Sequence, residues 1–296
     1  MSYDLFFRAR GPRVPSMEDM RTWFEKRPHY LFHGTADSGQ AGYENEATGV
    51  YFQFDFEAVD HDPDAPPVLP IAFNMNFFRP HVFALEAEPE VAAFVRHFDL
   101  GVEDPQSAIP SADYDTEGFL RGWDKGNRAA YRIMIGDGAR PPRQGNDASL
   151  WTLPSADIAR TWRWNFGKGA LAERMDRELI ACFVPTILYL RSDMAPGRVL
   201  RAVAWDGSCG ILLPEVDLVV RSSDEDGLGY IWMQDLAAAL PPSSEWPDPR
   251  ARVLSEELLG DAHRARMTSL FRPFQGARLE PSQVLDAELV APSSAR

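Results

Sequence analysis

The stretch that decides the fold is TGVYFQFDF, residues Thr48–Phe56. Large apolar side chains occupy every second position, at Val50, Phe52, Phe54 and Phe56. The positions between them hold Tyr51, Gln53 and Asp55. Because successive side chains of a β-strand point to opposite faces, this alternation predicts a strand with its four apolar residues in a core. A shift of one residue would expose all four, so the burial of this face fixes the register.

The segments around this strand predict an α+β fold. Ser16, with Asp19 three residues later, resembles a capping box that begins a helix ending near Arg27. A turn is expected over 34–42, and a second helix over Glu88–Phe98. Further strands are predicted at Tyr3–Arg8, Tyr30–His33 and Val68–Phe78. This order predicts a ferredoxin-like layer over residues 1–104, with helices on one face of an antiparallel sheet.

The remainder of the sequence predicts helices first and β-strands after them. Helices are predicted at Thr116–Ile135 and Pro154–Asp176, and a short one at Pro281–Ala287. Short connections predict an antiparallel meander of strands at Val184–Arg191, Val199–Trp205, Ile211–Val220 and Tyr230–Met233. We therefore expect an acidic α+β region at 1–110, and a helical segment with a β-meander at 111–296 packed with it into one unit.

Glycines recur every four residues in the first of these helices, at Gly118, Gly122 and Gly126. Glycine lowers intrinsic helix propensity, so such a pattern needs a packing reason. Small residues at this spacing permit the close approach of another helix, and we expect them to serve packing.

Composition narrows the class of protein. The 296 residues are 45% hydrophobic, which is enough for a packed core. The two cysteines, Cys182 and Cys209, do not form a CxxC pair, so neither a disulfide framework nor a zinc site is expected. No signal-like start and no apolar run of about 20 residues occurs, which predicts a cytoplasmic protein without a membrane segment.

Charge is the most informative feature for function. The formal net charge of −14 argues against nucleic-acid binding, which relies on basic side chains at phosphates. Residues 1–110 carry 8 basic and 18 acidic side chains, a net of −10, and residues 28–78 contain no Lys or Arg. A field of one sign attracts a basic partner and speeds its association. The candidate partner-binding residues are Glu44, Glu46, Asp55, Glu57, Asp60, Asp62 and Asp64. The alternative is a surface that only keeps the protein soluble.

Motifs for cofactors and metals are absent from the sequence. GxGxxG, the Walker A loop and HExxH do not occur, and no cofactor or metal is expected. The run Asp60–Asp64 has oxygen and imidazole donors but lacks EF-hand spacing, so a solvated loop is the better interpretation. Cys182 lies in an apolar run, where a thiol behaves as a small hydrophobe.

One enzymatic alternative remains. His33-Gly34-Thr35 followed by Gly49-Val50-Tyr51-Phe52 resembles the NAD-binding strands of diphtheria-toxin-like ADP-ribosyltransferases. In that family a His and an aromatic residue hold NAD, and a later Glu polarises the ribose. The resemblance implies a site of His33, Tyr51 and Glu215 that uses NAD.

A second resemblance covers more of the chain. It rests on Met1–Phe7 (MSYDLFF), Tyr43–Phe54 (YENEATGVYFQF), the region of LLPEVDLVV and the ending VLDAELV. These segments resemble an uncharacterised family of proteobacterial and myxobacterial proteins, some of which are similar to immunity proteins of polymorphic toxins. This resemblance implies a non-enzymatic protein that neutralises a basic toxin or effector. The oligomeric state stays open.

Overall fold

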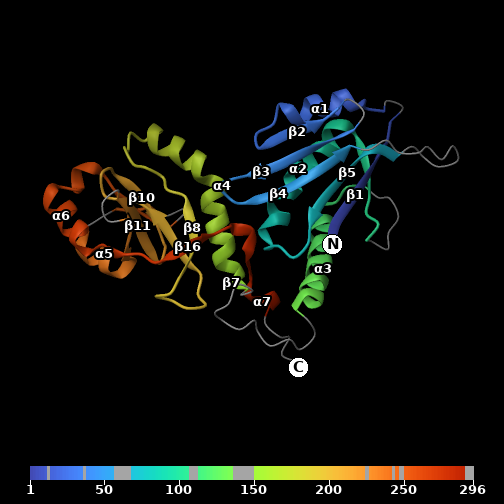
Figure 1. Cartoon of the computed structure of the whole chain (residues 1–296). Coiled ribbons are helices and arrows are strands. Elements are labelled where there is room, and N and C mark those ends of the chain that lie inside the picture. The colour runs from blue at the N-terminus through green and yellow to red at the C-terminus, as the bar shows by residue number, and fades with distance from the viewer. Residues whose placement is uncertain are drawn as a thin grey trace. The chain divides into compact units, whose positions relative to one another are not determined.

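The computed structural model describes residues 1–11, 14–35, 38–56, 68–106, 113–135, 150–223, 227–241, 244–246 and 250–290 (Figure 1). These residues form seven α-helices and several mainly antiparallel sheets, which confirms the α+β class. Two compact units are present. Unit 1 comprises Met1–Pro141 and Leu285–Arg296, and unit 2 comprises Pro142–Val284. The helix that follows residue 110 belongs to unit 1, and the C-terminal segment returns to that unit.

Unit 1 is built on a six-stranded antiparallel sheet with the strand order β2-β3-β4-β5-β1-β6. Its elements are β1 (Ser2–Ala9), α1 (Met17–Glu25), β2 (Tyr30–Gly34), β3 (Gly39–Asn45), β4 (Val50–Phe56), β5 (Val68–Asn76), α2 (Val82–Phe98), β6 (Leu100–Glu103), α3 (Thr116–Ile135) and α7 (Ala287–Val290).

Strand β4 lies inside this sheet with the predicted register. Its four apolar side chains are at most 4% exposed, which confirms that they face the core. The ring of Phe54 packs within 4.7 Å of Phe24 on α1 and 5.2 Å of Phe94 on α2, between ring centroids. Phe119 of α3 contacts Phe73 of β5 on the same face. All three helices therefore cover one face of the sheet.

The ends of α1 and α3 follow local sequence signals. Ser16 is the N-cap of α1, and its reciprocal hydrogen bonds with Asp19 form the predicted capping box. Helix α3 has the predicted bounds. Helix α2 begins at Val82 rather than at Glu88, and Pro89 lies inside it. Proline is tolerated there because the packing of α2 on the sheet outweighs one lost backbone hydrogen bond.

Two further expectations for unit 1 are corrected. The turn expected over 34–42 is shorter, because β3 begins at Gly39 and pairs with both β2 and β4. The α3 glycines pack against side chains of the sheet region rather than against a helix. A Cβ on Gly122 would lie 2.6 Å from the Tyr3 hydroxyl, and one on Gly126 would overlap the Phe77 ring.

Unit 2 contains a six-stranded sheet of order β15-β12-β11-β9-β8-β16 and a three-stranded sheet of order β10-β14-β13. Its elements are β7 (Trp151–Leu153), α4 (Ser155–Arg177), β8 (Ile187–Ser192), β9 (Leu200–Ala204), β10 (Ile211–Pro214), β11 (Leu218–Ser223), β12 (Gly227–Trp232), α5 (Met233–Ala239), β13 (Ser244–Trp246), β14 (Ala251–Leu254), the 3₁₀ turn Glu256–Leu258, α6 (Asp261–Leu270), β15 (Arg272–Pro273), β16 (Gly276–Leu279) and the 3₁₀ turn Pro281–Gln283. Strand β17 (Val284–Asp286) then leads back to unit 1.

The expected antiparallel meander of unit 2 is wrong in two places. The stretch 211–220 forms two strands in different sheets, because Pro214 ends β10. Because β10 belongs to the three-stranded sheet, β11 is the next strand of the six-stranded sheet after β9, and it pairs with β9 in parallel. The helix predicted at Pro281–Ala287 is instead a 3₁₀ turn followed by β17.

Candidate functional site

The face of the unit 1 sheet opposite the three helices carries mostly polar side chains, and we call it the polar face. The strand register sets its rows. Asp4 of β1 pairs with Asn74 of β5, which pairs with Gln53 of β4. In the next row Gln40 of β3 pairs with Asp55 of β4. Polar residues from strands distant in sequence thus meet on one surface.

Two carboxylates of the polar face are held in place by uncharged donors. Asp55 accepts hydrogen bonds from the Nε2 atoms of Gln40, at 2.9 Å, and Gln53, at 3.0 Å. Asp4 accepts from the Ser2 hydroxyl at 3.0 Å and from the Asn74 side-chain amide. Neutral donors orient a carboxylate without cancelling its charge. The charge of the stretch 28–78 pointed to Asp55, but the sequence gave no signal for Asp4, which accepts from Asn74 on another strand as well as from Ser2 on its own.

The sequence-predicted acids lie in three situations. Glu44 and Glu46 are exposed, and neither forms an ion pair with a described residue. Asp55 is half-buried in the hydrogen bonds given above. Four further candidates lie outside the described residues, namely Glu57, Asp60, Asp62 and Asp64. The described part of the predicted acidic surface therefore consists of Glu44, Glu46 and Asp55, on β3, β4 and the turn between them.

A buried acid fixes the segment that carries Glu44 and Glu46. Glu86 of α2 is 1% exposed, and its Oε1 accepts hydrogen bonds from Tyr43, Asn45 and Thr48 at 2.8, 2.8 and 3.0 Å. Burial and the Glu86 carboxylate both raise the pKa of Tyr43, which keeps its hydroxyl protonated as a donor. Because these anchors alternate with the two exposed acids, the backbone that carries Glu44 and Glu46 is held in place from both sides.

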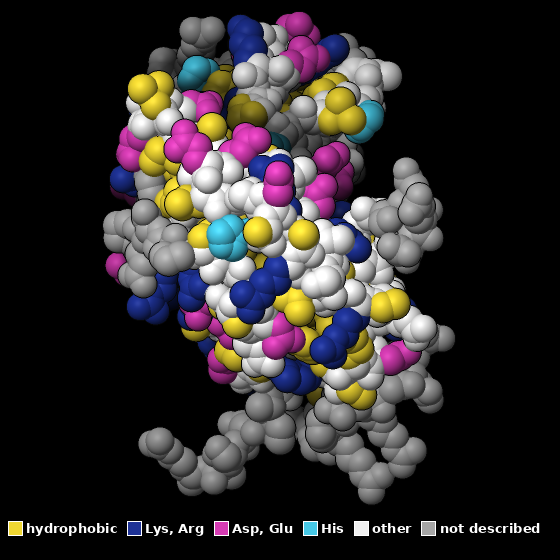
Figure 2. All heavy atoms as spheres, turned by 90° about the vertical axis from the view of Figure 1, so that its left-hand side faces the viewer, with side chains coloured by type: hydrophobic (Ala, Val, Ile, Leu, Met, Phe, Trp, Pro, Cys, Tyr) yellow, Lys and Arg dark blue, Asp and Glu magenta, His cyan; other side chains and the backbone are white. Residues whose placement is uncertain are grey.

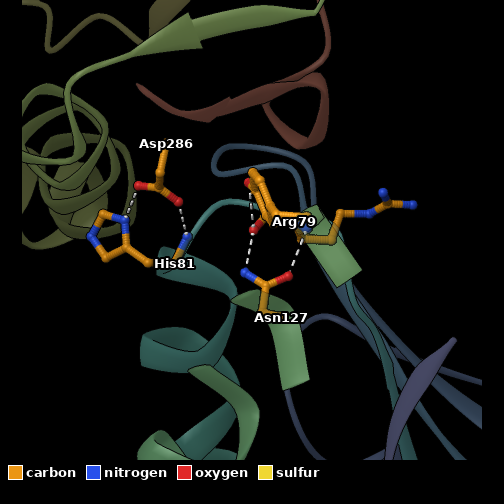
Figure 3. A network of polar contacts seen from close by, with 5 residues as sticks. Arg79, His81, Asn127 and Asp286 are labelled. Atoms are coloured by element: carbon orange, nitrogen blue, oxygen red, sulfur yellow. Dashed lines mark hydrogen bonds and ion pairs between the residues drawn. The ribbon is translucent and has the colours of Figure 1, made fainter. Parts of the chain in front are cut away.

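The loop between β5 and α2 is held by a second buried network (Figure 3). Asn127 of α3 is fully buried. Its Oδ1 accepts from the backbone N–H groups of Phe78, at 2.7 Å, and Arg79, at 3.3 Å, and its Nδ2 donates to the Arg79 carbonyl at 2.9 Å. This grip holds Phe78 at a φ of 62°, which is unusual for a bulky residue. The backbone of this loop is thereby fixed.

The C-terminal segment completes the network. Asp286 is fully buried, accepts the His81 backbone N–H at 2.8 Å and lies 2.6 Å from His81 Nδ1. His81 is the N-cap of α2, where exposed backbone N–H groups and the helix dipole favour a carboxylate. We interpret this pair as a structural clamp that joins the end of the chain to α2.

Two residues of the NAD-using alternative, His33 and Tyr51, lie in unit 1 but in different rows of its sheet, and the third, Glu215, belongs to unit 2. His33 lies on edge strand β2 and is aligned through Gln40 with Asp55, four residues from Tyr51 on β4. That offset corresponds to about 13 Å along the strands and about 10 Å across them. The Tyr51 hydroxyl accepts a hydrogen bond from Arg79 Nε at 2.8 Å. Glu215 is exposed between β10 and β11 of unit 2.

The described residues offer neither a metal centre nor a membrane-spanning helix. These residues contain no group of three His, Cys, Asp or Glu side chains placed to hold a metal ion. None of their helices has the length and apolar character needed to cross a bilayer. On the side of Figure 1 that bears α5 and α6, Figure 2 shows basic and acidic side chains together. The stretch 28–78 of unit 1, in contrast, contains acidic residues but no Lys or Arg.

Comparison of the chain with protein-family models, curated proteins and solved structures found no match in any of the three.

Proposed function

We propose that this chain is a non-enzymatic, cytoplasmic binding protein of the immunity or antitoxin kind, which neutralises a basic toxin or effector through its polar face. The observation that carries the proposal is the pair Glu44 and Glu46, two exposed carboxylates without a cationic partner in the described chain, on a backbone segment held by Glu86. A backbone that is already fixed lowers the cost of binding a basic surface, because the segment that carries the charges need not be ordered on binding.

The rest of the polar face supports the same chemistry. Asp4 and Asp55 add two carboxylates whose hydrogen-bond partners are neutral. Neighbouring amide and hydroxyl groups supply further hydrogen-bonding capacity at an interface. Phe6 and Leu31 lie on the same face at 37% and 62% exposure and offer apolar contact beside the charges. A surface with both features suits a protein partner better than a small ion.

Unit 1 differs from the expected ferredoxin-like layout in the number of its strands. That layout places two strands between its two helices, whereas four strands, β2 to β5, lie between α1 and α2 here. We infer that unit 1 is an enlarged relative of this layout, in which β1 and β6 keep their positions beside each other. The two additional strands extend the polar face.

Site-specific photocrosslinking tests the proposal. The replacement Glu46→p-benzoylphenylalanine, in the cells that make this protein, should form an adduct with a protein of net positive charge. When a lysate of these cells is irradiated instead, raising the ionic strength to about 1 M, where the screening length falls to about 3 Å, should abolish the adduct. The matched control is the same replacement at Glu173, an exposed acid on α4. Equal adducts at both positions, or adducts only with acidic proteins, would contradict the proposal.

A further inference from the structure

Unit 1 contains a cavity of about 460 Å³ between the sheet and α3. Its floor is apolar and includes Leu5, Val102 and Phe119, which are at most 9% exposed. Charged and polar side chains form its rim, and α3 contributes one wall. A volume of this size and an apolar floor with few polar groups are typical of small-molecule sites.

The glycines of α3 set how closely this wall of the cavity approaches the sheet region. Gly118, Gly122 and Gly126 all line it. A side chain at Gly122 would collide with the Tyr3 hydroxyl and approach Asp104 Oδ2, which lies 3.1 Å from the Cβ position. Each glycine in a helix costs about 1 kcal/mol relative to alanine. The helix thus keeps residues that weaken it, because they allow it to lie close against Tyr3 and Asp104 at one corner of the cavity.

The charges around the cavity are mostly paired, with two exceptions. Asp113 pairs with Arg10 at 2.8 Å, and Asp115 pairs with Arg121 at 3.2 Å. Asp104, in contrast, accepts hydrogen bonds from neutral groups, the Tyr3 hydroxyl at 3.0 Å and the backbone N–H of Gln106 at 2.8 Å. Lys125 has no ion-pair partner among the described residues. One carboxylate and one ammonium therefore line the cavity without neutralising each other.

The Tyr3–Asp104 contact fixes the polarity of this corner. Burial is the main cause of the raised pKa of Tyr3, and the Asp104 carboxylate raises it further. Tyr3 therefore remains a hydrogen-bond donor, and Asp104 stays oriented with acceptor capacity to spare. Lys125 lies one helical turn from Gly122, the residue that faces this corner.

We propose that this cavity binds a free zwitterionic α-amino acid with a large apolar or aromatic side chain. Its ammonium group would pair with Asp104, its carboxylate with Lys125, and its side chain would lie on Leu5, Val102 and Phe119. Two opposite charges that line one cavity without pairing match the two charges of such a ligand, and the apolar floor matches its side chain.

Isothermal titration calorimetry with L-phenylalanine tests the proposal on the wild-type chain. Two analogues each lack one charge: 2-phenylethylamine has no carboxylate, and 3-phenylpropanoate has no ammonium. L-phenylalanine should bind at least about tenfold more tightly than either, because each analogue leaves one charged group of the site unpaired. No binding of L-phenylalanine up to about 10 mM, or equal affinity for all three, would overturn the proposal.

Two substitutions assign the charges. Asp104→Asn should weaken L-phenylalanine by about tenfold or more but leave 3-phenylpropanoate unchanged, and Lys125→Gln should spare only 2-phenylethylamine. Arg132→Gln is the matched control, since it removes an exposed positive charge of α3 outside the cavity. Identical losses in all three variants would show an effect that does not depend on which charge is removed and would refute the assignment. The analogue series on the wild-type chain decides the proposal even if a variant does not fold.

Discussion

Replacing Asn127 by alanine should destabilise unit 1 by an amount that the structure allows us to work out. The substitution leaves the backbone N–H groups of Phe78 and Arg79 without their acceptor, whereas the Arg79 carbonyl keeps the Tyr131 hydroxyl at 3.2 Å. An unsatisfied buried N–H costs about 1–3 kcal/mol. The Arg79 bond is long, at 3.3 Å, so its loss lies at the low end of that range. The expected loss is about 2–4 kcal/mol.

The loss should be visible by calorimetry and hydrogen exchange. For a unit of about 150 residues, each kcal/mol lowers the melting temperature by about 2–4 °C, so we expect a shift of about 5–15 °C. The amides of Phe78 and Arg79 should exchange faster than in the wild type, because their acceptor is gone. Arg132→Ala, an exposed change on the same helix, is the control and should leave both readouts unchanged. A stability of Asn127→Ala within about 0.5 kcal/mol of the wild type would refute the reasoning.

Two further predictions concern the core and the enzymatic alternative. Phe54→Ala removes a fully buried ring from the centre of the aromatic core and should cost about 3–5 kcal/mol, whereas Gln53→Ala, its half-buried neighbour, should cost less than about 1.5 kcal/mol in denaturant unfolding. Equal small losses would mean that β4 is not central to the core. Incubation with NAD should release no more nicotinamide from the wild-type chain than from His33→Ala, because His33 and Tyr51 lie in separate rows of the sheet. Release that depends on His33 would instead establish NAD chemistry.

The sequence predicted those elements whose signals are local. The alternation in β4, the capping box at Ser16 and the apolar periodicity of α3 each lie within one segment, and the structure confirms all three. Strand β3 was missed because Gly39 and Gly42 read as a turn, although its pairing with two neighbours stabilises it. The split of 211–220 into two sheets depends on β14, which no local pattern identifies as the partner of β10.

The candidate site was predictable to the same limited extent. Glu44 and Glu46 could be predicted from the charge of the sequence alone, because this prediction does not depend on contacts with other segments. The roles of Glu86 and Asn127 could not be predicted, because their hydrogen-bond partners lie about 40–50 residues away in sequence. The close packing of α3 had a local signal, the glycine spacing, but its partners Tyr3 and Asp104 come from two other segments of the chain.

The most direct test of the proposed function is the association rate of the basic partner that photocrosslinks at position 46. The variant Glu44→Lys/Glu46→Lys changes the net charge from −14 to −10, and so does Glu173→Lys/Asp176→Lys on an exposed part of α4. The two variants thus differ in the position of the charge and not in its amount. We predict that the first slows association by about tenfold or more at low salt, with a loss that shrinks as salt rises, and that the second leaves the rate nearly unchanged. Equal rates for the two variants, or rates that do not depend on ionic strength, would contradict binding through the polar face.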